Sequence, residues 1–257
     1  MPSLDQVYNG PKRKVGYPEK RITTDDDGQS TEKYYNSVCF VSPEGKLLAT
    51  YAKHFLYYTD ENWAEEGPAF ISIPIETLGQ VGFGICMDVN PYQFKAAFNE
   101  FEFSRFHFNN KTNLMLCSMA WNKGEIAPKK EKVERKPKAP KAEAGASENG
   151  SEKIDGNGND LSEDDDEDEW EDEEDEEESA SQLQYETIQY WAMRMNPFYA
   201  QSEMPLHEPC VVIANRIGTE SGNMFVGSSC VIRLRSSGPD LLGMLPSNKE
   251  GILKVEI

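Results

Sequence analysis

The segment from Val81 to Met119 constrains the fold of this chain more than any other. It opens with an apolar run at 81–85 and closes with a second one at 114–119, and a mostly apolar helical stripe is expected between them, over residues 91–106. A strand, a helix and a strand in this order form a crossover unit, whose two strands pair in parallel. The sequence therefore predicts an α/β fold with mixed pairing.

Two hairpins are expected before this unit. The first joins strands at 35–41 and 47–51 through the turn Ser42-Pro43-Glu44-Gly45-Lys46, and the second joins residues 69–75 to the run that begins at Val81. Residues 1–33 are polar and rich in turn signals, so no strand is expected there. Beyond the crossover unit, the pattern predicts a helix from Leu183 that ends at Asn196-Pro197, and then strands at 211–214, 224–234 and 252–257.

The acidity of the chain is concentrated in one segment. The formal net charge is −19, but residues 163–178 hold fifteen acidic side chains, and without them the charge would be −4. The whole stretch 124–181 is rich in Lys, Glu and Pro, then in Gly, Asn and Ser, and finally in acid, and it cannot bury enough apolar area to fold alone. We expect a single domain over 1–257, interrupted by a disordered insertion at 124–181.

Several functional classes are disfavoured by composition. The five cysteines form no CxxC pair, which favours a reducing compartment, the cytoplasm or the nucleus. No apolar run approaches a membrane span, and three scattered histidines give no metal-ligand spacing, so neither a membrane anchor nor a metal is expected. The basic stretch 129–141 lacks interleaved aromatic residues, and nucleic-acid binding is not expected.

The residues that carry chemistry are Cys86, Lys53 and Glu61. Cys86 stands at the turn between the apolar run and the expected helix, where a nucleophile is exposed beside backbone N–H groups. Lys53 lies 33 residues upstream, and Glu61 follows it by eight. A cysteine, a lysine and a carboxylate can attack an amide carbonyl through a thioester. The alternatives are a buried structural cysteine, a solvated lysine and a solvated loop acid.

Several ordered motifs extend this picture over residues 16–122 and 190–257. On them the chain resembles the carbon–nitrogen hydrolase (nitrilase) superfamily, and within it the fungal amidohydrolases that act on N-terminal asparagine and glutamine. The motifs of the superfamily are Tyr35-Asn36-Ser37, Pro43-Glu44-Gly45, Tyr51-Ala52-Lys53, Gly84-Ile85-Cys86-Met87-Asp88, Ala214-Asn215-Arg216-Ile217-Gly218 and Gly227-Ser228-Ser229. The features of the narrower branch are the segment Asp60-Glu61-Asn62-Trp63-Ala64-Glu65-Glu66-Gly67, the segment Ser118-Met119-Ala120-Trp121-Asn122 and the long charged insertion.

The resemblance implies a four-layer α-β-β-α sandwich and a role for each residue. Cys86 is the nucleophile, Lys53 and the backbone N–H of Met87 hold the oxyanion, and Glu61 helps to hold the substrate. Trp121 and Asn122, at the carboxyl end of a strand, are expected to wall the pocket.

The resemblance also implies the activity. The substrates would be protein or peptide N-termini, deamidated with release of ammonia in an N-degron type of turnover, without a cofactor. The alternatives are an amidase, carbamoylase or nitrilase for small molecules, and a non-catalytic protein whose acidic segment binds basic partners. A homodimer is compatible with either.

One departure from the superfamily concerns the general base. Its catalytic glutamate lies on an early strand, ahead of the segment that matches 15–19, and nothing ahead of that segment resembles this strand. Glu19 matches a position downstream of the base and is not given its role. We therefore expect a sandwich that is incomplete at the N-terminus, with exposed apolar surface near Cys86. No carboxylate other than Glu61 is expected near both Cys86 and Lys53, and such a chain could be inactive.

Overall fold

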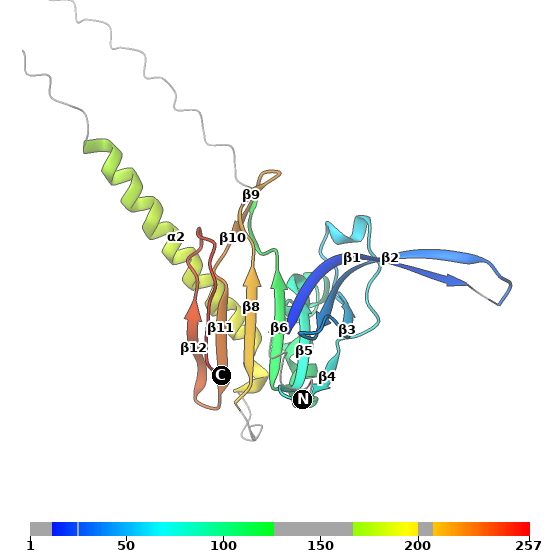
Figure 1. Cartoon of the computed structure of the whole chain (residues 1–257). Coiled ribbons are helices and arrows are strands. Elements are labelled where there is room, and N and C mark those ends of the chain that lie inside the picture. Colours follow the sequence, from blue (N-terminus) through cyan, green and yellow to red (C-terminus); the bar gives the residue numbers. More distant parts are fainter. Residues whose placement is uncertain (1–11, 25, 126–166, 200–207) are drawn as a thin grey trace, which may run out of the picture.

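The computed structural model describes residues 12–24, 26–125, 167–199 and 208–257. Its largest element is a six-stranded sheet of order β12-β11-β8-β6-β5-β4, in which β5, β6 and β8 run parallel and the other neighbours are antiparallel (Figure 1). The parallel pairing predicted for the crossover unit is confirmed. The strands are β4 (Ser72–Ile75), β5 (Gly79–Ile85), β6 (Leu114–Met119), β8 (Cys210–Asn215), β11 (Cys230–Arg235) and β12 (Gly238–Met244).

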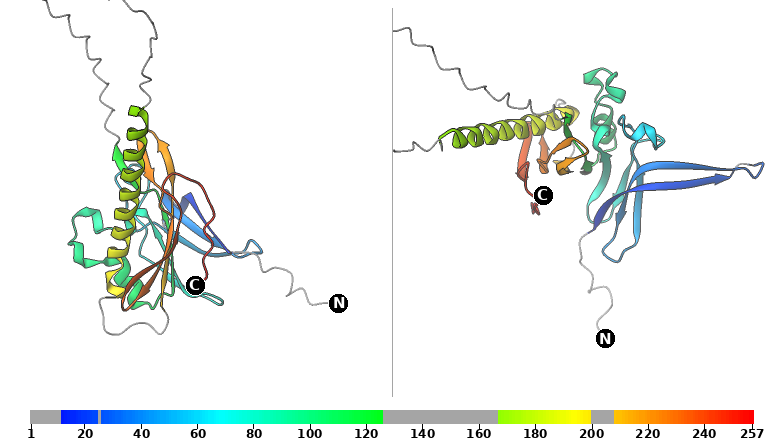
Figure 2. Two further views of the ribbon diagram at one scale, coloured as in Figure 1. Left: turned by 90° about the vertical axis from the view of Figure 1, so that its left-hand side faces the viewer. Right: turned by 90° about the horizontal axis from the view of Figure 1, so that it is seen from above.

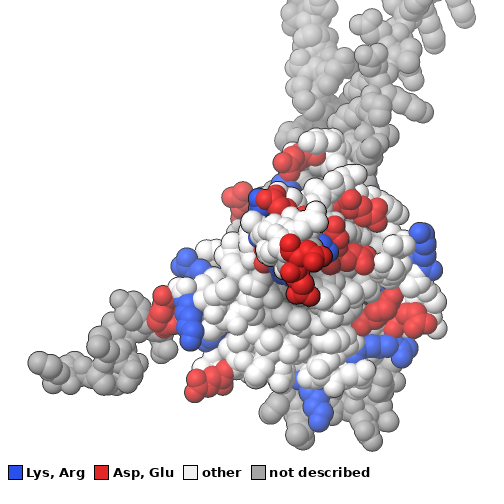
Figure 3. Space-filling view, turned by 90° about the vertical axis from the view of Figure 1, so that its right-hand side faces the viewer, with Lys and Arg blue, Asp and Glu red and all other residues white. Residues whose placement is uncertain are grey.

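Two smaller sheets accompany it. The first is antiparallel and contains β1 (Arg13–Thr24), β2 (Ser30–Val41) and β3 (Leu47–Ala52), and the β1–β2 hairpin projects well beyond the body of the molecule (Figure 1). The second is formed by β7 (Asn122–Glu125), β9 (Ile217–Glu220) and β10 (Asn223–Val226). The face from which the hairpin projects carries small groups of both charges and no continuous basic patch (Figure 3).

Side chains alternate along β5 between the two faces of the six-stranded sheet. Phe83 faces the β1–β2–β3 sheet, where its ring lies 5.5 Å from that of Phe40. Gly82 and Gly84 face α1 (Glu102–Asn109) instead, and a Cβ on Gly82 would lie only 2.3 Å from the His107 ring. The missing side chains therefore allow α1 to pack directly on the strand backbone.

Helix α2 (Glu167–Arg194) packs on the same side of the sheet as α1 (Figure 2). The described residues thus form three of the four expected layers, and none of their helices covers the outer face of the β1–β2–β3 sheet. Short 3₁₀ turns complete the elements: η2 (Asp60–Asn62), η3 (Cys86–Val89), η4 (Tyr92–Phe94), η5 (Phe98–Glu100) and η6 (Asn196–Phe198). No helix in the described part of the chain is both long enough and apolar enough to cross a membrane.

The boundaries of several elements differ from those expected. The helix expected at 91–106 begins only at Glu102, because Gln93, Phe94 and Phe101 have positive φ values of 52°, 54° and 49°, which break a right-handed helix. The strand expected at 224–234 is split by Gly227 and Ser228, with φ values of 56° and 63°.

Further differences concern strands, and the short strands β7 and β9 were among those not expected. Residues 252–257 form no strand, and Ile252 is almost fully exposed. Strands β1 and β12 were not expected. Charged residues and a proline interrupt their patterns, and both are half-exposed edge strands whose order depends on pairing with β2 and β11.

The expected insertion at 124–181 overlaps ordered elements at both ends. Residues 126–166 lie outside the described residues, but β7 runs to Glu125 and α2 already begins at Glu167. Glutamate is a good helix former, and carboxylates near a helix N-terminus interact favourably with its dipole. The packed C-terminal part of α2, with Trp191 fully buried, anchors the acidic turns that precede it. The helix ends before Asn196-Pro197, as predicted.

Candidate active site

Cys86 occupies a tight turn at the carboxyl end of β5. The strand ends at Ile85, and Cys86 begins the 3₁₀ turn η3 with φ 44°, a left-handed conformation that is unfavourable for a residue with a Cβ. Such strain persists where surrounding contacts enforce it, and it places the thiol at the top of the sheet. The predicted turn is therefore confirmed, although a 3₁₀ turn and not an α-helix follows it.

The fully buried Asp88 holds this turn in place. Its two oxygens accept hydrogen bonds from the Tyr51 hydroxyl and the backbone N–H groups of Ile85 and Phe55, each at 2.8 Å, and from that of His54 at 3.2 Å. Burial raises the pKa of Asp88, and the bonds from Phe55, Tyr51 and Ile85 oppose this rise. Because every partner is a donor, the arrangement suits the carboxylate form. Asp88 thus ties the nucleophile turn to the end of β3.

Lys53 comes from the segment just after β3 and is 3% exposed. Its ammonium forms an ion pair with Asp60, which is itself 6% exposed. The Asp60 carboxylate also accepts hydrogen bonds from Asn36 Nδ2 and from the backbone N–H of Tyr57, both at 3.0 Å. Buried charges need such partners, so the pair fixes the position of the Lys53 amine.

The expected role of Glu61 is not supported by this geometry. Glu61 is exposed, and the carboxylate that contacts Lys53 belongs to the preceding residue, Asp60. Both residues lie in η2, where successive side chains point in different directions, so only one of them can face the lysine. The spacing from Lys53 alone does not show which of the two acids, Asp60 or Glu61, contacts the lysine. The low exposure of Asp60 follows from its contacts with Asn36 and Tyr57, which only the fold reveals.

The electrostatic surroundings of Cys86 favour the neutral thiol at rest. Burial raises its pKa, and the charges of Asp60 and Asp88 act in the same direction. The positive charge of Lys53 and the backbone N–H of Ala120 lower the pKa. A thiolate formed during attack would therefore be stabilised mainly by Lys53 and Ala120.

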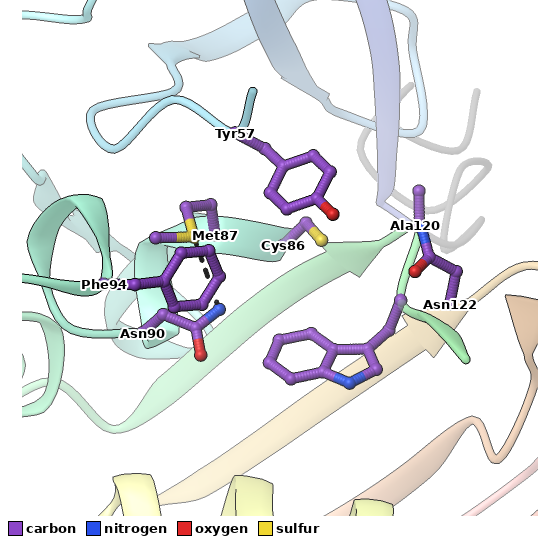
Figure 4. A pocket seen from close by; sticks show the side chains of 8 residues that line it. Tyr57, Cys86, Met87, Asn90, Phe94, Ala120 and Asn122 are labelled. Carbon is purple, nitrogen blue, oxygen red and sulfur yellow. Dashed lines mark hydrogen bonds between the residues drawn. The ribbon is translucent and has the colours of Figure 1, made fainter. Parts of the chain in front are cut away.

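Two cavities meet at Cys86. The larger has a volume of about 560 Å³ and is lined by Lys53, Asp60, Ser118 and, toward its rim, Arg216. The smaller has a volume of about 190 Å³ and is walled by Cys86, Met87, Asn90 and three aromatic side chains, Tyr57, Phe94 and Trp121 (Figure 4). Besides Cys86, three residues line both cavities: Tyr57, Ala120 and Asn122.

The structure therefore gathers most of the residues expected at the site. Cys86, Lys53, Met87, Trp121 and Asn122 surround these two cavities. Asn36, Tyr57, Asn90 and Phe94 also line the cavities and were not expected there. Asn36 belongs to the motif Tyr35-Asn36-Ser37, but that motif assigns it no role in the site, and the other three lie outside the motifs.

Glu19 does not join the site. Its carboxylate accepts hydrogen bonds from Ser37 Oγ at 2.6 Å and from Arg21 Nε at 2.9 Å, and it lines neither cavity. No carboxylate of the described residues hydrogen bonds to the Cys86 thiol, and the same residues contain no group of His, Cys, Asp and Glu suited to a metal. Contrary to the expectation that only Glu61 would lie near both residues, Asp60 pairs with Lys53 and lines the larger cavity with Cys86, whereas Glu61 lines neither cavity.

Comparison with known proteins gives a consistent picture. No family model matches the chain. It is 29% identical over 255 residues to Protein N-terminal amidase of Schizosaccharomyces pombe, covering 95% of this chain and 69% of that protein. It is 42% identical over 126 residues to Protein N-terminal amidase of Saccharomyces cerevisiae, covering 42% of this chain and 26% of that protein.

Solved structures share the fold. A crystal structure of N-terminal amidase superposes with a TM-score of 0.56 at 24% identity, covering 92% of this chain and 76% of that chain. The same enzyme with an Asn-Glu-Ala peptide gives a TM-score of 0.55 at 23% identity, covering 92% and 75%. A Nesterenkonia amidase from the nitrilase superfamily gives 0.50 at 15% identity, covering 93% and 59%.

Proposed function

We propose that this chain, which has the fold of the nitrilase superfamily, is an amidohydrolase that converts N-terminal asparagine or glutamine of peptides to aspartate or glutamate. The observation that carries the proposal is the strained turn that presents Cys86 to a cavity shared with the buried Lys53 amine. The similarity to proteins named N-terminal amidase, and to structures of that enzyme with Asn-Glu-Ala and Gln-Val peptides, supports the choice of substrate.

Acylation would use groups that are already in position. The Cys86 sulfur attacks the carboxamide carbon, and the carbonyl oxygen becomes an anion. Lys53 donates to this oxygen from one side, and the Met87 N–H, in the first turn of η3 where no intrahelical partner exists, donates from the other. Each preorganised donor of this kind is worth about 3–4 kcal/mol of barrier.

Two bonds then break in turn. The C–N bond breaks as the nitrogen takes up the proton that left the thiol, and ammonia departs from a thioester on Cys86. Water adds to the thioester, the C–S bond breaks, and the thiol regains a proton as the free carboxylic acid leaves. The sum is carboxamide plus water giving carboxylate and ammonium. The described residues supply the roles in attack and in oxyanion binding.

The test is ammonia release from an Asn-initiated dipeptide, compared with the same dipeptide acetylated at its amine. The free peptide is expected to react and the acetylated one to react far more slowly, because an amidase for N-termini recognises the ammonium. Cys86→Ala is expected to abolish the release. Equal rates with both peptides would indicate a small-amide hydrolase instead, and normal turnover by Cys86→Ala would exclude the thioester mechanism.

The cellular setting is also a proposal. We infer a reducing compartment, the cytoplasm or the nucleus, and a place in N-degron turnover. All five cysteines are free thiols, which supports this.

The acidic residues 163–178 would bind basic partners, and that binding is expected to weaken between low and physiological salt. Gel filtration of the purified chain tests for a homodimer.

A further inference from the structure

The two cavities at Cys86 differ in chemistry. The larger one holds Lys53 and Asp60 and opens toward the exposed Arg216, so it has both the oxyanion donor and an exit for a peptide chain. The smaller one is walled by three aromatic rings and the Asn90 amide, and no lysine or arginine lines it. A substrate whose amide carbon lies on Cys86 therefore has a second, aromatic compartment within reach.

The aromatic walls are fixed before any ligand arrives. The Trp121 ring packs at 5.5 Å from Tyr190 and at 5.7 Å, nearly perpendicular, from Trp191. Its backbone N–H donates to Asn215 Oδ1 at 2.8 Å. On the other side, the rings of Tyr57 and Phe94 lie 6.3 Å apart at 82°. Figure 4 shows the Tyr57 and Phe94 side chains on the same side of the cavity as Cys86.

Asn90 adds a polar group to this compartment. It is 3% exposed, and its Oδ1 accepts a hydrogen bond from the Tyr190 hydroxyl at 2.6 Å, while Nδ2 is directed to Met87 Sδ at 3.5 Å. An amide oxygen has two acceptor positions, so this bond leaves one for a ligand. Because a thioether sulfur can only accept, the contact of Nδ2 with Met87 Sδ fixes which end of the amide is the acceptor.

The lining of the small cavity suits a cation, because it offers three aromatic rings and contains no lysine or arginine. Aromatic faces attract an ammonium ion, with the strongest attraction at Trp. A cationic group in the small cavity would therefore meet attraction from the rings and no repulsion from a cationic side chain in its walls.

The chemistry of the substrate supplies such a group at the right place. In an N-terminal asparagine the α-ammonium is three covalent bonds from the carboxamide carbon, and in glutamine it is four. Only a compartment that itself contacts Cys86 can receive a group so close to the reacting carbon. Both cavities meet this condition because Cys86 lines both, but the larger one already contains the Lys53 ammonium, which would repel a second cation.

Resting on the proposed function, we propose that the compartment formed by Tyr57, Phe94, Trp121 and Asn90 binds the free α-ammonium of the substrate. The carboxamide then lies on Cys86 with its oxygen toward Lys53, and the peptide leaves through the larger cavity. This makes the aromatic compartment the element that distinguishes a free N-terminus from a blocked one.

The experiment compares Trp121→Leu, Trp121→Phe and Phe94→Leu with the wild-type chain, using the free and acetylated Asn-initiated dipeptides. Trp121→Leu is expected to raise KM for the free peptide about three- to thirtyfold, with a smaller change in kcat, whereas Trp121→Phe retains most of the affinity. The rate on the acetylated peptide should fall less than the rate on the free peptide, so that the preference for the free amine becomes smaller. Phe94 is half-exposed, so its variant is expected to fold and to show a milder increase of the same kind. Tyr185→Leu removes an exposed ring far along α2 and serves as the control.

Binding is measured separately with Cys86→Ser, by calorimetry with the same two dipeptides. The preference for the free amine is expected in Cys86→Ser and should be largely lost in Cys86→Ser/Trp121→Leu. If Trp121→Leu and Phe94→Leu lower kcat but leave the preference unchanged, the compartment does not bind the ammonium, and the proposal is wrong although the enzyme function stands. If the wild-type chain and Cys86→Ser show no preference at all, the proposed function fails as well.

Discussion

The buried ammonium of Lys53 pairs with the carboxylate of Asp60 and not with that of the adjacent, exposed Glu61. The same Asp60 carboxylate receives Asn36 Nδ2 and the Tyr57 N–H. Asp60 therefore links the oxyanion donor to β2 and to the loop that supplies one wall of the aromatic compartment. Its consequences can be separated from those of Glu61 by experiment.

Asp60→Asn is expected to lower kcat/KM at least tenfold and to destabilise the fold. Removing one partner of a buried pair leaves an uncompensated charge, which costs about 3–5 kcal/mol. Glu61→Gln, its matched control, should change either quantity little. Ammonia release and urea unfolding measure both, and equal losses in the two variants would contradict the assignment.

The ionisation of Cys86 should respond in opposite directions to its two charged neighbours. Lys53→Met is expected to raise the pKa of the thiol, because the Lys53 charge lowers it, and Asp60→Asn is expected to lower it. The rate of iodoacetamide alkylation as a function of pH reports this pKa. Since Asp60→Asn should also be less active, a more available thiolate would accompany slower turnover. If the pKa of the Cys86 thiol moved in the same direction in both variants, this electrostatic arrangement would be ruled out.

Gly67→Ala is expected to destabilise the chain. A Cβ at this position would lie 2.1 Å from the Ala52 carbonyl oxygen, and the Gly67 N–H donates to Lys53 O at 2.7 Å, so the backbone beside Lys53 must shift. Overpacking of this kind costs about 1–3 kcal/mol. In the control Gly16→Ala, the nearest atoms to the new Cβ are 4.0 Å away. The measurement is thermal unfolding of both variants. Equal melting temperatures would show that the backbone around Gly67 can shift without loss of stability.

Stability should fall in acid partly through His107. Burial lowers the pKa of this residue from 6.5 to about 3, so the unfolded chain takes up a proton there before the folded chain does. The stabilisation is complete above pH 6.5 and is lost as pH falls toward 3, by up to about 1.4 kcal/mol per pH unit. His107→Gln is expected to flatten this slope in urea unfolding between pH 7 and 4. An unchanged slope would mean that His107 is not neutral in the fold.

Local signals predicted that Cys86 and Lys53 lie at one cavity. An apolar strand that ends at Cys86, and a lysine between apolar neighbours at the end of another strand, both depend on residues close in the chain. The choice between Asp60 and Glu61 depends on the phase of a three-residue turn, which a spacing from Lys53 does not encode. Phe94 reaches the cavity from a left-handed backbone position that no residue preference predicts.

The fold shows the same division. The hairpins at 35–51 and 69–86 were predicted because each turn is local. Strand β1 was missed because its order comes from pairing with β2 along its whole length, in a segment whose own pattern is polar. The start of α2 at Glu167, inside the expected insertion, was missed because the helix is held by its apolar C-terminal part, far along the chain from Glu167.

The distribution of thiols makes this chain suitable for a covalent chemical probe. Burial raises the pKa of Cys117 and Cys230 to about 12 and also raises that of Cys210, so these three side chains are poor targets for electrophiles. Burial raises the pKa of Cys86 as well, but its side chain lines both cavities, where a small electrophile can reach it. A small amine that carries a chloroacetamide should therefore label Cys86 in preference to the three buried cysteines, and the tagged peptide would report occupancy of the site in a cell extract.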